Sequence, residues 1–152
     1  MPLKKIISGG QTGVDRAGLD AALELGIPIS GYCPKGRKAE DGIISDKYPL
    51  TETESAGYSK RTKLNVIKSD ATIIFTRAKP YGGTKLTITL AKKHKKPFLV
   101  VYLNKKNRSK EIAAWIKNKK INTLNIAGPR ESKNPGVYDE AKKALLAVIA
   151  EL

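Results

Sequence analysis

The sequence predicts an α/β protein, a single domain of residues 1–152 built as a three-layer sandwich around a five-stranded parallel sheet. Short β-branched runs alternate with amphipathic stretches of roughly ten residues, the pattern of successive βαβ units. The length of 152 residues suits one domain of common size, and no repeat or linker interrupts the alternation. Right-handed crossovers then place helices on both faces of the sheet.

The first part of the chain predicts two strands with a helix between them. Lys4–Ser8 is a short apolar run that stops at two glycines, and Ile27–Tyr32 is a second such run. Val14–Leu25 has helical periodicity and is followed by Gly26, a residue that commonly ends helices. The apolar stripe of this helix consists of Leu19, Ala22, Leu23 and Leu25.

A long polar segment, Cys33–Ser59, separates these elements from the rest. Loops longer than about 12–15 residues inside compact domains are usually functional or disordered. This one contains glycines, prolines and the adjacent acids Glu40 and Asp41, so we interpret it as functional.

The remaining elements alternate regularly. Thr84 stands where it could cap the helix Thr84–Lys93. The other predicted helices are Lys60–Lys68, Ser109–Asn118 and Val137–Glu151, and the other predicted strands are Ala71–Thr76, Phe98–Leu103 and Asn122–Ala127. We expect the strand order 2-1-3-4-5, which sets the ends of the first and third strands side by side.

The turn after the first strand predicts an anion site. It reads Ser8-Gly9-Gly10-Gln11-Thr12-Gly13 and leads directly into a helix. The first turn of a helix has unpaired N–H groups and partial positive charge, and glycines let a ligand approach closely. Phosphates bind such places. The candidate binding residues here are Gly9, Gly10, Gln11, Thr12, Gly13 and Arg16.

Other strand ends carry similar residues, and the carboxyl ends of parallel strands meet at one edge, where ligands bind. On the second predicted helix, Arg61 and Asn65 share a face, and Arg61 could fork onto an anion. The sequence therefore predicts a cleft for a small anionic ligand. Its further candidates are Lys35, Gly36, Gly82, Gly83, Thr84, Arg130 and Ser132.

No constellation of residues demands catalysis, and none has the spacing of a metal site. The first turn matches neither the dinucleotide fingerprint nor the Walker pattern. Glu40 and Asp41 could act as acid or base, they could bind a cationic edge of a ligand, or they could hold the long loop by salt bridges. The residues favour a binding protein, and an enzyme acting on a nucleotide is the alternative.

The net charge of +15 is concentrated in lysine clusters of the last two thirds of the chain. Such a surface attracts nucleic acid without reading its sequence, although a solvated surface is the simpler interpretation. No apolar run reaches the length of a membrane span. With one cysteine, Cys33, no internal disulfide can form, and we expect a cytoplasmic protein.

Several motifs resemble one family, in order along nearly the whole chain. They are Ile6–Arg16, Cys33–Arg37, Ala39–Gly42, Tyr48–Thr53, Arg61–Val66, Ser69–Thr72, Gly82–Thr84 and Gly128–Ser132. The family is that of the molybdenum cofactor carrier proteins. The resemblance implies a Rossmann-like fold, a homotetramer, and binding of the molybdenum cofactor, a pterin dithiolene with a phosphate. It also implies anion binding by the Gly9–Gly13 turn, Arg61 and the Gly82–Thr84 turn.

A more distant resemblance is to the lysine-decarboxylase-like, nucleotide-processing families. Those enzymes place a catalytic acid shortly after a Gly-Thr pair. Here Gly82-Gly83-Thr84 is followed by Lys85, Leu86 and Thr87, without the acid. This departure counts against a phosphoribohydrolase. A nucleotide is the alternative ligand to the molybdenum cofactor.

Overall fold

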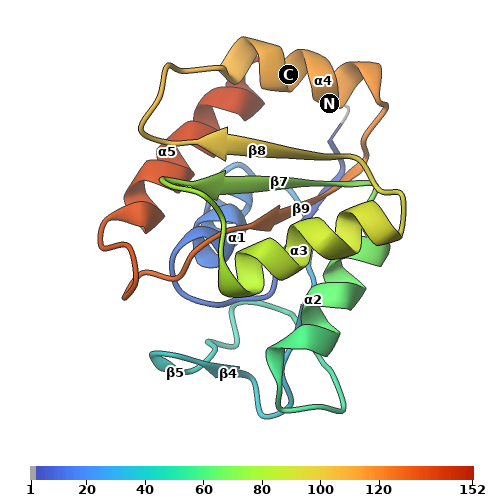
Figure 1. The fold of residues 1–152 in the computed structure, drawn as a ribbon, viewed down its shortest axis with the longest axis vertical. Coiled ribbons are helices and arrows are strands. Elements are labelled where there is room, and N and C mark those ends of the chain that lie inside the picture. The colour runs from blue at the N-terminus through green and yellow to red at the C-terminus, as the bar shows by residue number, and fades with distance from the viewer. Residues whose placement is uncertain (1–2) are drawn as a thin grey trace.

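The computed structural model describes residues 3–152 and has a five-stranded parallel sheet at its centre (Figure 1). Its strands, in spatial order, are β2 (Ile29–Ser30), β1 (Lys5–Ile7), β9 (Thr123–Ala127), β7 (Ala71–Thr76) and β8 (Phe98–Tyr102). Every neighbouring pair is parallel. The predicted α/β class and Rossmann-like architecture are confirmed.

The predicted strand order 2-1-3-4-5 is wrong at one point. The last strand, β9, lies between β1 and β7 rather than at the edge, so the order in the same numbering is 2-1-5-3-4. The central strand β9 contains a buried polar residue, Asn125. Its Nδ2 donates to the Oγ1 of Thr72 at 3.2 Å, so the amide has a partner inside the sheet. The end of β9 therefore separates the ends of the first and third strands.

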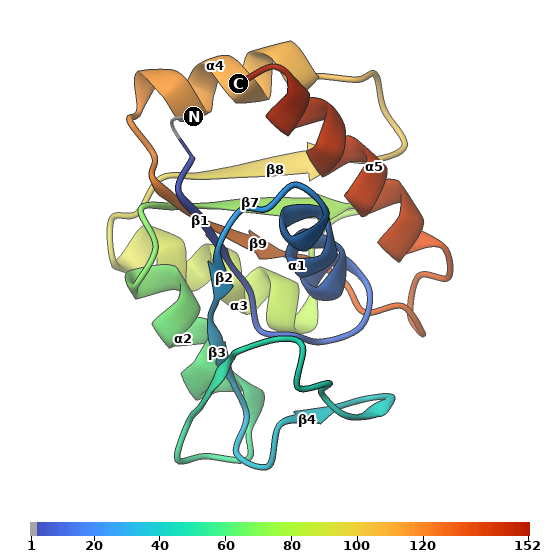
Figure 2. The ribbon, with the colours of Figure 1, turned by 180° about the vertical axis from the view of Figure 1, so that it is seen from behind.

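The helices form two layers. α1 (Val14–Glu24), α4 (Ser109–Asn118) and α5 (Val137–Ala150) cover one face of the sheet. α2 (Tyr58–Ile67) and α3 (Gly82–Lys93) cover the other (Figures 1 and 2). Because α3 and α5 follow adjacent strands, β7 and β9, but pass to opposite faces, a crevice opens between the two strand ends.

The main hydrophobic core lies between the sheet and the layer of α1, α4 and α5. Its largest fully buried side chains include Ile6, Ile73, Phe75, Ile116 and Leu145. Leu19 and Ala22 are buried as predicted, but Leu23 and Leu25 are exposed. They lie near the end of α1, where they face solvent.

Two helices begin earlier than the sequence predicts. α2 begins at Tyr58 and α3 at Gly82, each two residues before the predicted start. Tyr81 is therefore the N-cap of α3, and Thr84 lies buried inside the first turn, so its predicted capping role is wrong. The glycine pair thus belongs to the helix.

The long segment after β2 is ordered by short strands and by one arginine. It contains β3 (Tyr32–Cys33), β4 (Lys38–Ala39), β5 (Gly42–Ile43) and β6 (Thr51–Glu52). β4 and β5 form an antiparallel hairpin. Arg37 donates to the carbonyl oxygens of Ile44, Ser45, Tyr48 and Leu50. Across residues 3–152, no helix has the length and apolar character needed to cross a membrane.

Candidate ligand-binding site

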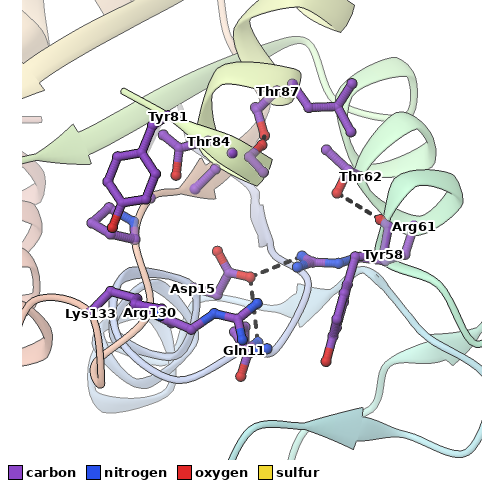
Figure 3. Close-up of a pocket in the computed structure, with 16 residues that line it drawn as sticks. Gln11, Asp15, Tyr58, Arg61, Thr62, Tyr81, Thr84, Thr87, Arg130 and Lys133 are labelled. Atoms are coloured by element: carbon purple, nitrogen blue, oxygen red, sulfur yellow. Dashed lines mark hydrogen bonds and ion pairs between the residues drawn. The ribbon is translucent and has the colours of Figure 1, made fainter. Parts of the chain in front are cut away.

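A cavity of about 430 Å³ lies beyond the end of β9, at the edge of the sheet where the carboxyl ends of the strands meet. Its wall consists of the first turn of α3, the start of α2, the beginning of α1 and the loop after β9 (Figure 3). Six of the predicted site residues line it, namely Gln11, Arg61, Gly82, Gly83, Thr84 and Arg130.

The floor of the cavity contains a buried ion pair. The Nη1 of Arg61 lies 3.0 Å from the Oδ2 of Asp15, and the side chains are 14% and 6% exposed. Burial raises the pKa of Asp15 above its ordinary value of 3.8, and the charge of Arg61 offsets only part of that rise. Figure 3 shows the other carboxylate oxygen directed toward the side of the cavity formed by α3.

Gly9 makes room for this arginine. A Cβ at position 9 would lie 1.6 Å from the Nη1 of Arg61. The guanidinium therefore packs directly on the backbone of the turn, and only glycine permits that approach.

Three N–H groups of the turn over residues 9–13, and that of Val14 directly after it, have acceptors within the protein. Gly10 donates to the Oγ of Ser8 at 3.2 Å, and Gln11 donates to the Oδ2 of Asp15 at 3.4 Å. Thr12 donates to the Oε1 of Gln11 at 3.0 Å, and Val14 donates to the carbonyl of Pro129 at 3.2 Å. The carboxylate of Asp15 thus stands where the sequence predicts an external anion.

Gly10 and Gly13 face the protein rather than the cavity. Both have positive φ. A Cβ at Gly10 would meet Leu50 at 2.6 Å, and one at Gly13 would meet the carbonyl of Pro129 at 2.4 Å. They let neighbouring loops pack against the turn.

The first turn of α3 gives the cavity an open helix N-terminus. Gly82 and Gly83 are exposed, and no side chain of the described residues caps the helix. The first N–H groups of a helix have no carbonyl partner within it and carry partial positive charge. A Cβ at either glycine would meet nothing within 4 Å, so a ligand has free access to the backbone.

Two further cations and two aromatic rings complete the wall. Arg130 and Lys133 come from the loop after β9 and line the cavity with Tyr58 and Tyr81. The guanidinium carbons of Arg61 and Arg130 lie 5.4 and 5.6 Å from the centre of the Tyr58 ring. In Figure 3 the two tyrosines stand on opposite sides of the opening.

Gln11 presents a buried donor without a partner. It is 6% exposed, and its Oε1 accepts from the N–H groups of Thr12 and Glu40 at 3.0 and 2.9 Å. These two bonds fix the orientation of the amide. Its Nε2 has no hydrogen-bond partner within the described residues. A buried unpaired donor that lines a cavity is a place where a ligand acceptor gains a hydrogen bond.

A second cavity, of about 700 Å³, is lined by four other predicted residues: Thr12, Gly13, Arg16 and Ser132. The side chains of Thr12, Arg16 and Ser132 contact the tip of the β4–β5 hairpin. The hydroxyls of Thr12 and Ser132 bond Glu40, and Arg16 pairs with Asp41. These contacts attach the hairpin to the body of the protein, through an ion pair at Asp41 and through hydroxyl hydrogen bonds at Glu40.

Lys35, Gly36 and Asn65 line neither cavity. Lys35 and Gly36 are exposed on the long segment, where the N–H of Gly36 donates to Glu52 at 2.6 Å. The side-chain amide of Asn65 is bonded on both sides to the backbone of Tyr32, at 2.8 and 3.0 Å. Asn65 therefore connects α2 to β3.

Sequence reasoning missed Asp15, Tyr58, Tyr81 and Lys133 as cavity residues. Asp15 had a signal, because an acid in the first turn of a helix can bind the turn itself as well as stabilise the dipole. Tyr81 precedes the glycine pair and Lys133 follows Arg130 by three residues, but neither spacing indicates a shared cavity.

These features define a Rossmann-like α/β protein with a basic cavity at the carboxyl edge of a parallel sheet. The chain belongs to the family described as the "Circularly permutated YpsA SLOG family", whose model matches residues 6–149.

One solved structure is similar over almost the full length of both chains. It is the 1.45 Å crystal structure of a protein from Syntrophus aciditrophicus SB named "Putative molybdenum carrier protein". The two chains share 41% sequence identity and superpose with a TM-score of 0.93, covering 97% of this chain and 96% of the other. No curated protein matches the chain.

Proposed function

We propose that this protein binds and carries the molybdenum cofactor, holding its phosphate at the first turn of α3. The observation that carries the proposal is the coincidence in one cavity of an open helix N-terminus, the cations Arg130 and Lys133, and the unpaired amide of Gln11. The name of the similar Syntrophus protein supports a molybdenum-related ligand.

The charges of the cavity fit a phosphate monoester. Arg61 is paired with Asp15, and Arg130 lies 3.9 Å from the hairpin acid Glu40. Lys133 has no carboxylate partner among residues 3–152. A phosphate monoester carries a charge of about −1.5 to −2 at neutral pH, which two cations and a helix N-terminus would balance.

The aromatic residues fit the other part of the cofactor. A pterin is flat and apolar on its faces, and Tyr58 and Tyr81 offer rings at the opening of the cavity. The described residues contain no cluster of three His, Cys, Asp or Glu side chains that could hold a metal ion. The dithiolene of the cofactor would itself hold the molybdenum, so the residues fit the cofactor better than a bare cation.

The variant Gly83→Asp tests the proposal, with Gly83→Asn as its control. Position 83 has open space and no positive φ, so both variants should fold. The aspartate places a negative charge where the phosphate would sit, whereas asparagine keeps the size without the charge. Protein incubated with cofactor released from a molybdoenzyme is re-isolated, and bound molybdenum and pterin fluorescence are measured.

We expect Gly83→Asn to retain the cofactor and Gly83→Asp to lose at least about tenfold in affinity, the equivalent of 1.4 kcal/mol. Equal retention by wild type and Gly83→Asp would remove the start of α3 from the site. Absence of molybdenum and pterin from the wild type would overturn the proposal.

A nucleotide-processing enzyme is the second candidate, and Asp15 favours it. The carboxyl group of Asp15 lines the cavity beneath the start of α3, and burial raises its pKa above the ordinary value. Groups that transfer protons often have such shifted pKa values. Glu40, the acid first considered from the sequence, lies in the other cavity. Incubation with a panel of nucleoside monophosphates should release base or phosphate, and Asp15→Asn should abolish that release. Absence of turnover by the wild type dismisses this candidate.

We also propose the homotetramer that the family resemblance implies. β8 is an edge strand, and its residues Leu99 and Val100 are only partly buried. Apolar residues at an open sheet edge favour association. Native mass spectrometry distinguishes a tetramer from a monomer.

A further inference from the structure

A third cavity, of about 250 Å³, opens on the face of the sheet that α4 and α5 cover. It shares no lining residue with the proposed cofactor cavity. Its floor consists of core side chains that are each at most 7% exposed, namely Phe75, Val101, Ile112 and Val148. The cavity, called the slot below, therefore has an apolar floor.

The rim of this slot is strongly basic. It carries Lys105, Lys106, Arg108 and Lys143, all of them exposed. The acid on the rim, Glu140, is paired with Arg77 at 2.5 Å. Arg108 has an exposed partner in Glu111 at 3.0 Å, whereas no ion pair links the three lysines to an acid among residues 3–152. The start of α4 adds little, because Asn107 already accepts from the N–H of Ser109 at 2.7 Å.

We propose that this slot binds a small amphiphile with an anionic head group on an unbranched apolar chain. The chain would lie on the apolar floor, where leaving water is favourable by roughly 25 cal/mol per Å². The head group would remain at the rim among the lysines, because burying an unpaired charge is costly. Cavities for drug-sized ligands are about 300–1,000 Å³, so this smaller slot suits a short chain.

Charge complementarity excludes two related ligand classes. An alkylammonium ion would place a positive head among four cations. An alcohol of the same length would fill the floor but leave the rim charges without a counter-ion. The proposal therefore predicts a strict preference for the anionic head.

Isothermal titration with octanoate, octanol and octylammonium tests this preference. We expect octanoate to bind with one site per chain, and the other two compounds to bind at least tenfold more weakly. Raising the salt concentration should weaken octanoate binding, since the head group lies at the solvent-exposed rim. Equal binding of octanol and octanoate, or no binding of octanoate at millimolar concentration, overturns the proposal.

Two variants locate the site. Lys143→Glu reverses one rim charge, and we expect at least tenfold weaker octanoate binding; Lys110→Glu, an exposed residue of α4 outside the slot, should bind as the wild type does. Ala147→Phe should fill the slot and abolish binding, with its folding checked by circular dichroism. Octanoate binding unchanged by both Lys143→Glu and Ala147→Phe would place the ligand elsewhere.

Vesicles distinguish a free amphiphile from a lipid surface. Binding to anionic phospholipid vesicles that persists in Ala147→Phe, combined with no binding of dispersed octanoate, would mean that the lysines merely attract a charged surface. That outcome also overturns the proposal.

Discussion

The guanidinium of Arg61 lies against the carboxylate of Asp15, with 3.0 Å between Nη1 and Oδ2, on the floor of the cavity beneath α3. This pair has two consequences. The carboxylate of Asp15 accepts a hydrogen bond from the N–H of Gln11, in the turn before α1, so this donor is paired within the protein. The pair also fixes Arg61 beside the position proposed for a phosphate.

Removal of the acid should destabilise the protein. Asp15→Asn leaves a nearly buried guanidinium without its counter-charge, and because the adjoining cavity admits water we expect a loss of about 1–3 kcal/mol in the free energy of unfolding. Urea denaturation measures it. Asp139→Asn, which removes an exposed acid from the first turn of α5, should change stability by less than about 1 kcal/mol. Equal effects of the two substitutions would contradict the structural importance of the pair.

Substitutions at Gly9 and Arg61 should have strongly non-additive effects on the free energy of unfolding. Gly9→Ala forces the guanidinium away from the backbone and from Asp15, so we expect it to lower stability by about 1–2 kcal/mol in the wild type. In an Arg61→Ala background the added methyl meets no guanidinium, and the same substitution should have little effect. A double-mutant cycle by urea denaturation yields the coupling energy. Additive effects would be inconsistent with the observed packing.

Gly31 should tolerate no side chain. Its φ is +141°, and a Cβ there would lie 2.0 Å from the carbonyl oxygen of Ser8, which is backbone and cannot move aside. We expect Gly31→Ala to destabilise the protein by more than about 3 kcal/mol. Gly83→Ala is the matched control, because its Cβ would meet open space. Thermal unfolding of both variants measures the difference.

The hairpin contacts should make stability depend on acidic pH. Partial burial raises the pKa of Glu40, but hydrogen bonds from Ser132 and Thr12 outweigh it, and the pKa lies below its ordinary value of 4.5. Below pH 4.5 the unfolded chain therefore binds more protons than the folded chain at this site. The stability from Glu40 is present above pH 4.5 and is lost as the pH falls through the folded pKa.

Glu40→Gln should remove this contribution, lowering stability by about 1 kcal/mol at pH 7 and flattening the decline below pH 4.5. Denaturation at a series of pH values measures both effects. An unchanged slope would show that Glu40 does not contribute to the acid dependence.

The fold class was predictable from the sequence because strand and helix patterns are local. The position of β9 was not, since Thr123–Ala127 contains polar residues that suggest an edge strand. In the structure the side chains of Asn125 and Thr72 form a hydrogen bond between the neighbouring strands β9 and β7. Phe98–Tyr102 is wholly apolar or aromatic and yet forms the edge strand β8. Strand order depends on such pairings between distant residues, which no local pattern reveals.

The candidate site was predicted in part for a similar reason. Glycine spacing correctly indicated turns with backbone donors, and Gly82 and Gly83 do open a helix at the cavity. Glycine spacing could not show that the N–H groups of the turn before α1 already have acceptors within the protein. These acceptors belong to Ser8, Asp15, Gln11 and Pro129. Those partners come from tertiary contacts as well as from neighbouring positions.

The central place of β9 also bears on how the chain acquires its structure. β1 and β7 are each bonded to β9 and not to one another, so within the described part of the chain residues 123–127 alone join the two halves of the sheet by strand pairing. During synthesis the two halves of the sheet cannot pair with β9 until residues 123–127 have left the ribosome. A nascent chain stalled before that point would hold two unfinished strand pairs, each exposing an edge that chaperones could recognise.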